Sequence, residues 1–384
     1  MEQPLNALAL VMGGGGARAA YQVGLLRFLA ARLPRLEIPI LTGVSAGAIN
    51  TVKLASAPGD FVDGVRQLED LWRRLSIDQV FRVGAPGLVR NALRWGLRLV
   101  AGGSRAAPVA RGLVDTAPLQ RFLASALYGD ADAPAFRPLA GIAHNLDRGK
   151  LRAVAVTTTN YATGQSITWV EGRDVALWER PQRRALRAAI DLRHVMASAA
   201  LPVMFPAVQI DEAWHGDGGI RLTAPLSPAM QLGASRIIAV STRYQRRQDE
   251  ANQLLVTGYP PLAQVAGVLM NAIFLDMLDY DAMILSRINE LLIKIRPEER
   301  GSLRPVELLV VRPSVDLGKL SAQYEATLPG PFRFFTRGLG TRETRSPDYL
   351  SMLMFNKEYI QQLIAIGEAD AERRADEILA FVSR

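Results

Sequence analysis

The sequence predicts an α/β fold built around a mainly parallel β-sheet. Two strand–turn–helix units near the N-terminus carry this prediction. An apolar run at residues 5–12 leads through four glycines into a helical segment at 17–33. A second apolar run at 38–42 leads through Gly43-Val44-Ser45-Ala46-Gly47 into a stretch of small residues. Strands that alternate with helices are typical of parallel sheets, because each helix carries the chain back to begin the next strand in the same direction.

Further buried strands are predicted downstream, in short segments rich in aliphatic or β-branched residues. They lie at residues 151–159, 236–242 and 305–311. We also predict one long helix over 262–295 and two amphipathic helices after Pro347.

The polar stretch Tyr244–Asn252 marks the predicted boundary within the chain. In this interpretation residues 1–245 form the catalytic core, and residues 246–384 form a helical extension. The strand at 305–311 in that extension packs on the core. A chain of 384 residues with 49% hydrophobic composition is long enough for one large domain or two modest ones.

Composition excludes several kinds of site. The chain has no cysteine, so a disulfide, a thiolate zinc site and a cysteine nucleophile are all excluded. Its 3 histidines argue against a histidine-rich metal centre. The net charge of +8 favours association with anionic surfaces. No recognised nucleic-acid motif accompanies this charge, so we expect anionic lipid and no nucleic acid.

The N-terminal residues do not read as a secretory signal, because no basic region precedes the apolar run that leads into the glycines. No apolar stretch reaches the roughly 18 residues that a membrane-spanning helix needs. We therefore expect a cytoplasmic protein that is soluble or peripherally associated with a membrane.

The Gly43–Gly47 motif is typical of a nucleophile on a sharp strand-to-helix turn. Such a turn is strained and needs small neighbours, and it lifts the serine hydroxyl toward substrate. The amide N–H of Ala46, at the helix start, is placed to help stabilise an oxyanion. A G-x-S-x-G pattern alone is weak, since it also arises by chance.

The run Gly13-Gly14-Gly15-Gly16-Ala17-Arg18 lies between another strand and helix. Consecutive glycines let several amide N–H groups converge on one anion. That anion is either a nucleotide phosphate or the oxyanion of acyl transfer, and a glycine turn without any ligand remains an alternative. The run lacks the Gly-Lys-Ser/Thr ending of a P-loop.

A third motif is His215-Gly216-Asp217-Gly218-Gly219, predicted to form a polar turn after a short strand. Glycines on both sides allow the Asp217 carboxylate to approach another loop closely. The alternative is an ordinary Asp-Gly turn, which is common.

Together the three motifs closely resemble the patatin-like phospholipase family. That family combines a GGGxR oxyanion loop, a G-x-S-x-G elbow and a distant Asp-Gly-Gly or Asp-Gly-Ala. Here the matching residues are Gly14, Gly15, Gly16 and Arg18 of the loop, Ser45 of the elbow, and Asp217. The stretch ASAALPVMFPAV also looks like the family's segment before the aspartate strand. Ala19 stands where the family often has glycine.

The resemblance implies a three-layer α/β/α fold and hydrolysis of acyl esters in phospholipids, lysophospholipids or other lipids. It assigns Ser45 as nucleophile and Asp217 as general base. The Gly14–Gly16 loop would hold the oxyanion, while Arg18 would orient the loop or meet a lipid phosphate. No metal or organic cofactor is required.

Three alternatives stay open. An α/β-hydrolase triad would combine Ser45 with Asp191 or Asp211 and with His194 or His215. A nucleotide- or lipid-binding module without turnover would use the glycine run as a phosphate cradle. An acyltransferase would share the acyl-enzyme with the hydrolase.

Residues 87–100 contain candidate membrane contacts. Arg90, Arg94 and Arg98 follow a spacing of four and share one face of a predicted helix, with Trp95 suited to a lipid interface. The alternative is a core-packed helix with an arginine-rich solvent face. A second aromatic and basic candidate lies at Pro331–Arg345.

Overall fold

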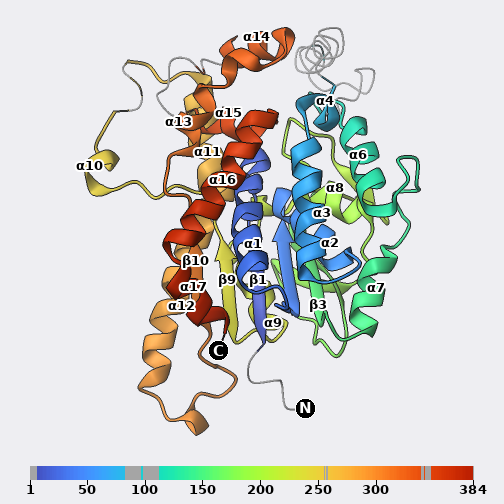
Figure 1. The fold of residues 1–384 in the computed structure, drawn as a ribbon, viewed down its shortest axis with the longest axis vertical. Coiled ribbons are helices and arrows are strands. Elements are labelled where there is room, and N and C mark those ends of the chain that lie inside the picture. Colours follow the sequence, from blue (N-terminus) through green and yellow to red (C-terminus); the bar gives the residue numbers. More distant parts are fainter. Residues whose placement is uncertain are drawn as a thin grey trace.

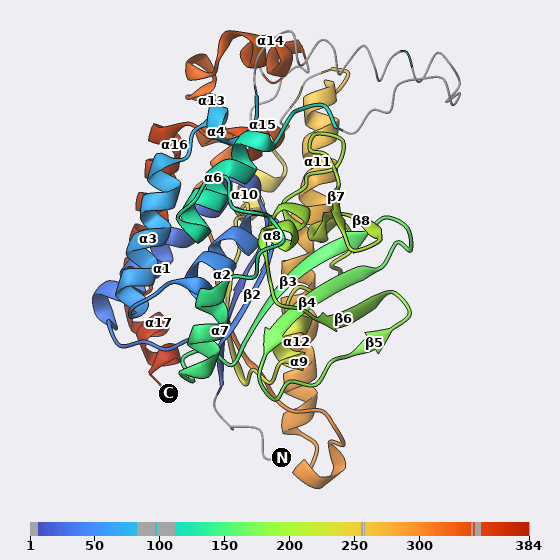
Figure 2. The same cartoon turned by 90° about the vertical axis from the view of Figure 1, so that its right-hand side faces the viewer.

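A computed structural model describes residues 7–82, 112–254, 258–338 and 347–383, together with positions 97, 256 and 341. The described chain forms three layers, with helices on both faces of a central sheet (Figures 1 and 2). The sheet is mostly parallel, which confirms the predicted fold class.

The sheet has the strand order β10-β9-β1-β2-β3-β4-β6-β5, and β8 pairs with both β3 and β7. The five strands from β10 to β3 are parallel, whereas β3 is antiparallel to β4 and to β8. The bounds are β1 Leu8–Met12, β2 Ile40–Val44, β3 Ala153–Asn160, β4 Ser166–Gly172, β5 Glu179–Arg180, β6 Arg183–Arg187, β7 Val208–Ile210, β8 Ala213–Asp217, β9 Arg236–Val240 and β10 Glu307–Val311.

One face of the sheet carries the larger helical layer and the other face a smaller one. The larger layer contains α1 Ala20–Arg32, α2 Ala46–Ser56, α3 Phe61–Arg74, α4 Ile77–Val80, α6 Ala117–Tyr128, α7 Ala140–Asp147, α8 Leu192–Ser198, α13 Leu317–Ala322, α15 Asp348–Leu353, α16 Lys357–Arg373 and α17 Ala375–Val382. The smaller layer contains α9 Ser227–Gln231 and α12 Asp276–Ile293. The remaining helices are α10 Gln248–Ala251, α11 Leu262–Phe274 and α14 Gly330–Gly338.

Alternation along β1 explains why its sequence is apolar throughout. Leu8, Leu10 and Met12 face the core under the larger layer, while Ala9 and Val11 face the smaller core. Successive side chains of a strand point to opposite faces, so a strand covered on both sides buries every residue.

The C-terminal helices are packed tightly on the first helix of the chain. A Cβ at Gly24 of α1 would lie 2.1 Å from the carbonyl oxygen of Ile364. A Cβ at Gly367 of α16 would lie 2.1 Å from the carbonyl oxygen of Tyr21. Both positions must therefore lack a side chain, because the helix backbones approach each other directly.

The region 262–295 differs from the prediction of one long helix. The structure has α11 and α12, which meet at Leu275, where φ is −119°. Leu275 itself is buried, and α12 then runs along the sheet with Leu278, Ala282 and Leu285 in the smaller core. Tertiary packing thus redirects the chain at a point where no glycine or proline interrupts the helix-forming sequence.

Candidate active site

Ser45 occupies the turn between β2 and α2 with an unusual backbone conformation. Its φ is 58° and its ψ is −133°, a strained region for a residue with a side chain. The flanking glycines are needed because a Cβ at Gly47 would lie 2.1 Å from the Met12 carbonyl oxygen. A Cβ at Gly43 would lie 2.3 Å from Oγ1 of Thr51. The turn is a nucleophile elbow in its geometry.

Strand register brings Asp217 next to this turn. Because β4 covers the whole of one edge of β3, the opposite edge is shared by β2 and β8. Val44, the last residue of β2, lies opposite Thr157 of β3, and Asp217 lies opposite Thr158. Ser45 and Asp217 therefore come together where β2 ends and β8 ends on the same strand.

The Asp217 carboxyl is fully buried, and its electrostatics follow from that burial. Burial raises the pKa of Asp217 to about 7, although the Ser45 hydroxyl and the amide of Gly219 lower it in part. The Gly219 N–H donates to Oδ1 at 2.8 Å. Oδ2 makes no hydrogen bond of ordinary geometry to any described residue, so the contact with Ser45 is long or bent. Such contacts often tighten only when substrate is bound.

The glycine loop packs directly against Ser45. A Cβ at Gly14 would lie 2.8 Å from the Ser45 Cβ, so a side chain there would displace the serine. The φ angles of Gly15 and Gly16 are 138° and 56°, which glycine adopts readily. The Gly14 carbonyl accepts from Oγ1 of Thr242 at 2.7 Å, and the Gly15 carbonyl accepts from the Arg18 amide at 3.1 Å.

The Arg18 side chain is turned toward α15. Its Nε donates to Oγ of Ser351 at 2.6 Å, and its guanidinium forms an ion pair with Asp348. A Cβ at Gly16 would lie 2.1 Å from the Met352 carbonyl oxygen, so the loop and α15 are also in backbone contact. Of the two roles considered for Arg18, these contacts favour orientation of the loop.

Ser198, which was not predicted from the sequence, connects the Ser45 turn to strand β3 by hydrogen bonds. The Ser45 amide donates to Oγ of Ser198 at 2.9 Å, and that hydroxyl donates to the Thr157 carbonyl at 2.7 Å. Two residues further on, the Ala200 carbonyl accepts from the Asp217 amide at 3.1 Å. The only sequence signal for this residue was its place in the stretch ASAALPVMFPAV.

An apolar pocket opens beside Ser45. It extends from Gly15, Gly16 and Ser45 between α2, α3, α6 and α15, and its wall includes Ile49, Trp72, Leu119, Phe205, Phe274 and Met352. Phe274 also borders a second hollow, on the other side of the glycine loop, lined by Thr42, Gly219 and Thr242. Phe274 therefore borders both the pocket beside Ser45 and the second hollow.

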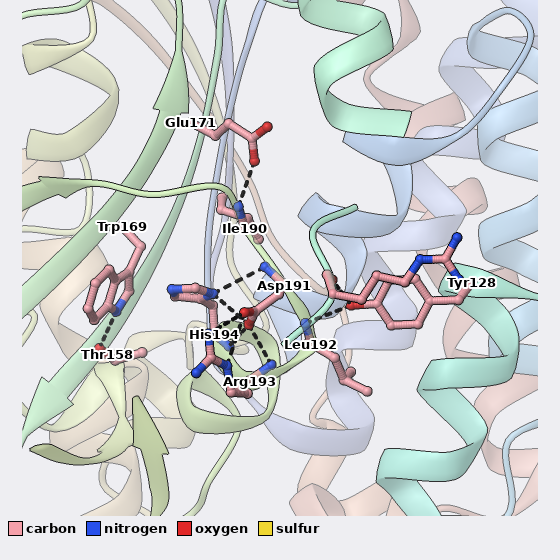
Figure 3. A network of polar contacts seen from close by, with 10 residues as sticks. Tyr128, Thr158, Trp169, Glu171, Ile190, Asp191, Leu192, Arg193 and His194 are labelled. Atoms are coloured by element: carbon pink, nitrogen blue, oxygen red, sulfur yellow. Dashed lines mark hydrogen bonds and ion pairs between the residues drawn. The ribbon is translucent and has the colours of Figure 1, made fainter. Parts of the chain in front are cut away.

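The histidines of the alternative triad are engaged elsewhere. Figure 3 shows His194 paired with Asp191, with Nδ1 of the histidine 2.8 Å from Oδ1 of the aspartate. Asp191 also caps α8 through the amides of Arg193 and His194. Nδ1 of His215 lies 3.0 Å from Oγ1 of Thr158, and burial lowers the His215 pKa to about 4. Neither of these described histidines hydrogen-bonds to Ser45.

None of the other predicted site features contributes a described residue to this site. Arg90, Arg94, Trp95 and Arg98 fall outside the described residues. The described part of Pro331–Arg345 is mainly α14, with Phe332 buried and Phe334 exposed. A wider pocket between Pro34 and Leu151 includes none of the predicted site residues. Over the described ranges, no three His, Asp or Glu side chains come together as a metal ion would require.

A family model described as patatin-like phospholipase matches residues 10–230, more than half of the chain. The chain belongs to the patatin-like phospholipase family. This membership supports a lipid-ester hydrolase. A patatin-like phospholipase domain-containing protein of Caenorhabditis elegans is 40% identical over 76 residues, which is 18% of this chain and 6% of that protein.

Solved patatin-like structures are more distant. The human GIVD cytosolic phospholipase A2, in complex with a fluorophosphonate inhibitor and terbium chloride, is 14% identical with a TM-score of 0.44. VipD from Legionella pneumophila is 13% identical with a TM-score of 0.37. The alignments cover 99% and 94% of this chain but only 59% and 66% of those chains.

Proposed function

We propose that this chain is a serine acyl hydrolase that cleaves fatty acyl esters of phospholipids or lysophospholipids. The observation that carries the proposal is the pair formed by Ser45, on its strained turn, and the buried Asp217 carboxyl, which the register of β2 and β8 on β3 brings together. It lies beside a pocket with an apolar wall, and a fatty acyl chain is the kind of ligand such a wall accommodates.

In the proposed first half-reaction, Asp217 accepts the proton of Ser45 while Oγ attacks the ester carbonyl. The tetrahedral oxyanion is held by amides of the Gly14–Gly16 loop and of Ala46. The Gly14 and Gly15 carbonyls have partners of their own in Thr242 and Arg18, which supports a loop held in one conformation. Collapse of the intermediate breaks the bond to the alcohol, which takes its proton from Asp217.

In the second half-reaction a water molecule attacks the acyl-enzyme. Asp217 accepts one proton from that water, and the carbonyl carbon forms its new bond to the hydroxide oxygen. The bond to Ser45 then breaks, and Oγ takes the proton back from Asp217 as the fatty acid leaves. A pKa of about 7 suits a group that must both accept and return a proton near neutral pH.

The proposal is tested with the purified chain, a phospholipid substrate and a fluorophosphonate probe. Wild type is expected to release fatty acid and to become labelled, whereas Ser45→Ala loses both properties and Asp217→Asn loses hydrolysis. His215→Asn and His194→Asn, checked for folding by thermal denaturation, are expected to retain hydrolysis. Labelling that persists in Ser45→Ala would contradict the role of Ser45 as nucleophile. Activity that depends on either histidine and not on Asp217 would contradict the role of Asp217 as base.

A further inference from the structure

Helix α11 presents an apolar face that nothing in the described chain covers. Leu262, Val265, Val268 and Leu269 are between 42% and 62% exposed, and their spacing places them on one side of the helix. The helix, LAQVAGVLMNAIF, contains no charged residue. Tyr259, just before it, is 95% exposed. A contiguous apolar surface of this kind marks an interaction site more often than a scattered exposed leucine does.

The opposite side of α11 rests on α15 through small residues. Ala263 and Gly267 are buried, and a Cβ at Gly267 would lie 3.6 Å from the Asp348 Cβ. Asn271 donates to Oδ2 of Asp348 at 2.7 Å. The helix is therefore held against the protein along one side, while Leu262, Val265, Val268 and Leu269 on the other side stay exposed.

The geometry argues for a helix that lies in a membrane surface and against one that crosses it. Contrary to the sequence-based expectation, the segment Leu262–Ile293 meets length and hydropathy criteria for a span, with a mean hydropathy of 1.4 over an 18-residue window. However, α12 packs within the protein and is not available to cross a membrane. Leu278 and Leu285 are in the smaller core, and Asp279 forms ion pairs with Arg243 and Arg312. The 13 residues of α11 alone reach about 20 Å, less than the ~30 Å of a bilayer's hydrocarbon core.

The same helix leads to the proposed catalytic site. Its last residue, Phe274, borders the pocket that contains Ser45, and a Cβ at Gly219 would lie 2.3 Å from the Phe274 ring. In both overall views α11 lies at the end of the molecule that holds α14 and α15, whereas α12 extends toward the opposite end (Figures 1 and 2). A lipid layer against α11 would thus meet the protein on the side of the acyl pocket.

We propose that the outward face of α11 docks on an anionic bilayer surface and delivers lipid to the pocket beside Ser45. The delivery of lipid to the pocket rests on the proposed lipid hydrolysis. The docking on a membrane depends only on the exposed face of α11. An uncharged helix face enters the boundary between headgroups and acyl chains without desolvating any charge. The net charge of +8 supplies long-range attraction to anionic lipid.

Docking is tested by co-sedimentation with vesicles of phosphatidylcholine and phosphatidylglycerol, in a Ser45→Ala background that leaves the vesicles intact. The variant Leu262→Glu/Leu269→Glu is expected to lose at least about tenfold in vesicle affinity. The matched control Leu291→Glu/Ile293→Glu makes the same charge change on α12 residues that are 59% and 76% exposed. The control is expected to bind vesicles like the parent.

With Ser45 intact, the α11 variant is expected to lose hydrolysis of vesicle phospholipid while its rate on a short water-soluble ester changes less than about twofold. The proposal is overturned if the parent does not bind vesicles, if the α11 variant binds normally, or if the control loses binding equally. It is also overturned if the α11 variant changes only the oligomeric state, since the face then contacts another copy. If wild type hydrolyses neither substrate yet docks through α11, docking stands and the proposed hydrolysis fails.

Discussion

The amide N–H of Ser45 donates to Oγ of Ser198 at 2.9 Å, across 153 positions of sequence. The same hydroxyl donates to the Thr157 carbonyl on β3, so one serine ties the strained elbow to the central sheet. A residue with φ of 58° keeps that conformation only if its surroundings hold it. Ser198 is therefore a positioning residue for the proposed nucleophile.

Replacing Ser198 by alanine should lower stability and turnover together. The change leaves the Ser45 amide and the Thr157 carbonyl without their buried partner, a loss of roughly 1–3 kcal/mol. Relaxation of the elbow should reduce kcat on a soluble ester more than it raises KM, because ester binding depends mainly on the pocket. Steady-state kinetics and thermal denaturation measure both effects. A variant that loses stability but keeps kcat would show that Ser198 does not position Ser45.

The rate of ester hydrolysis should depend on a group that titrates near pH 7. Asp217 acts as a base only when it is deprotonated, and its pKa is about 7 because of burial. We therefore expect kcat/KM to rise with pH through about 7 and then level off. The burial-lowered pKa of His215 is about 4, so a profile that inflects near 4 would point away from Asp217. The His215→Asn variant should keep the inflection of wild type.

Asp217→Asn should be inactive yet more stable than wild type at alkaline pH. Folding raises the Asp217 pKa from its ordinary 3.8 to about 7, so the folded state binds the proton more tightly than the unfolded state. Stability from this group is full below about 4 and is lost as pH rises through about 7. Asparagine cannot ionise and avoids that loss. Urea unfolding at pH 5 and at pH 8 tests this, and a stability gain that is not larger at pH 8 would refute it.

The ion pair between Arg18 and Asp348 should couple the glycine loop to α15. Arg18→Met leaves Asn271 as the one described side chain that donates to the Asp348 carboxylate, and should cost up to roughly 3–5 kcal/mol. Asp348→Asn removes the carboxylate charge that Arg18→Met leaves unpaired. The double variant should therefore lose less free energy of unfolding than the sum of the losses in the two single variants. Urea unfolding of the four proteins measures this coupling, and additive losses would exclude it. Arg18→Lys keeps the charge and should be intermediate.

Phe274 should set the chain length that the pocket accepts. Phe274 borders both the pocket beside Ser45 and the hollow lined by Thr42 and Thr242. Phe274→Ala joins these spaces and should shift the preferred substrate toward longer acyl chains in a series of nitrophenyl esters. Leu291→Ala, at an exposed position of α12, serves as the control and should keep the wild-type profile. An unchanged profile in Phe274→Ala would mean that the ring does not limit the pocket.

Local sequence predicted the parallel part of the fold well. The strand–turn–helix units around Gly13–Gly16 and Ser45 are recognisable because glycines stand where a side chain would collide. Strands β4 to β7 were not predicted, since β5, β6 and β7 are short and only partly buried. A strand of a few residues is too short to show a clear apolar or alternating pattern. The split between α11 and α12 was missed because no glycine or proline marks it in the sequence.

By itself the sequence determined the family and which residue types could do the chemistry, because the glycine, serine and aspartate motifs are each contained in a few consecutive positions. Only the tertiary structure decided which of them meet. The register of β2 and β8 on β3 brings Asp217 beside Ser45, whereas His194 pairs with Asp191 at the start of its own helix. Contacts between Ser45 and Ser198, or between Arg18 and α15, depend on how distant segments pack. Such contacts join residues far apart in the sequence, so no pattern of neighbouring residues predicts them.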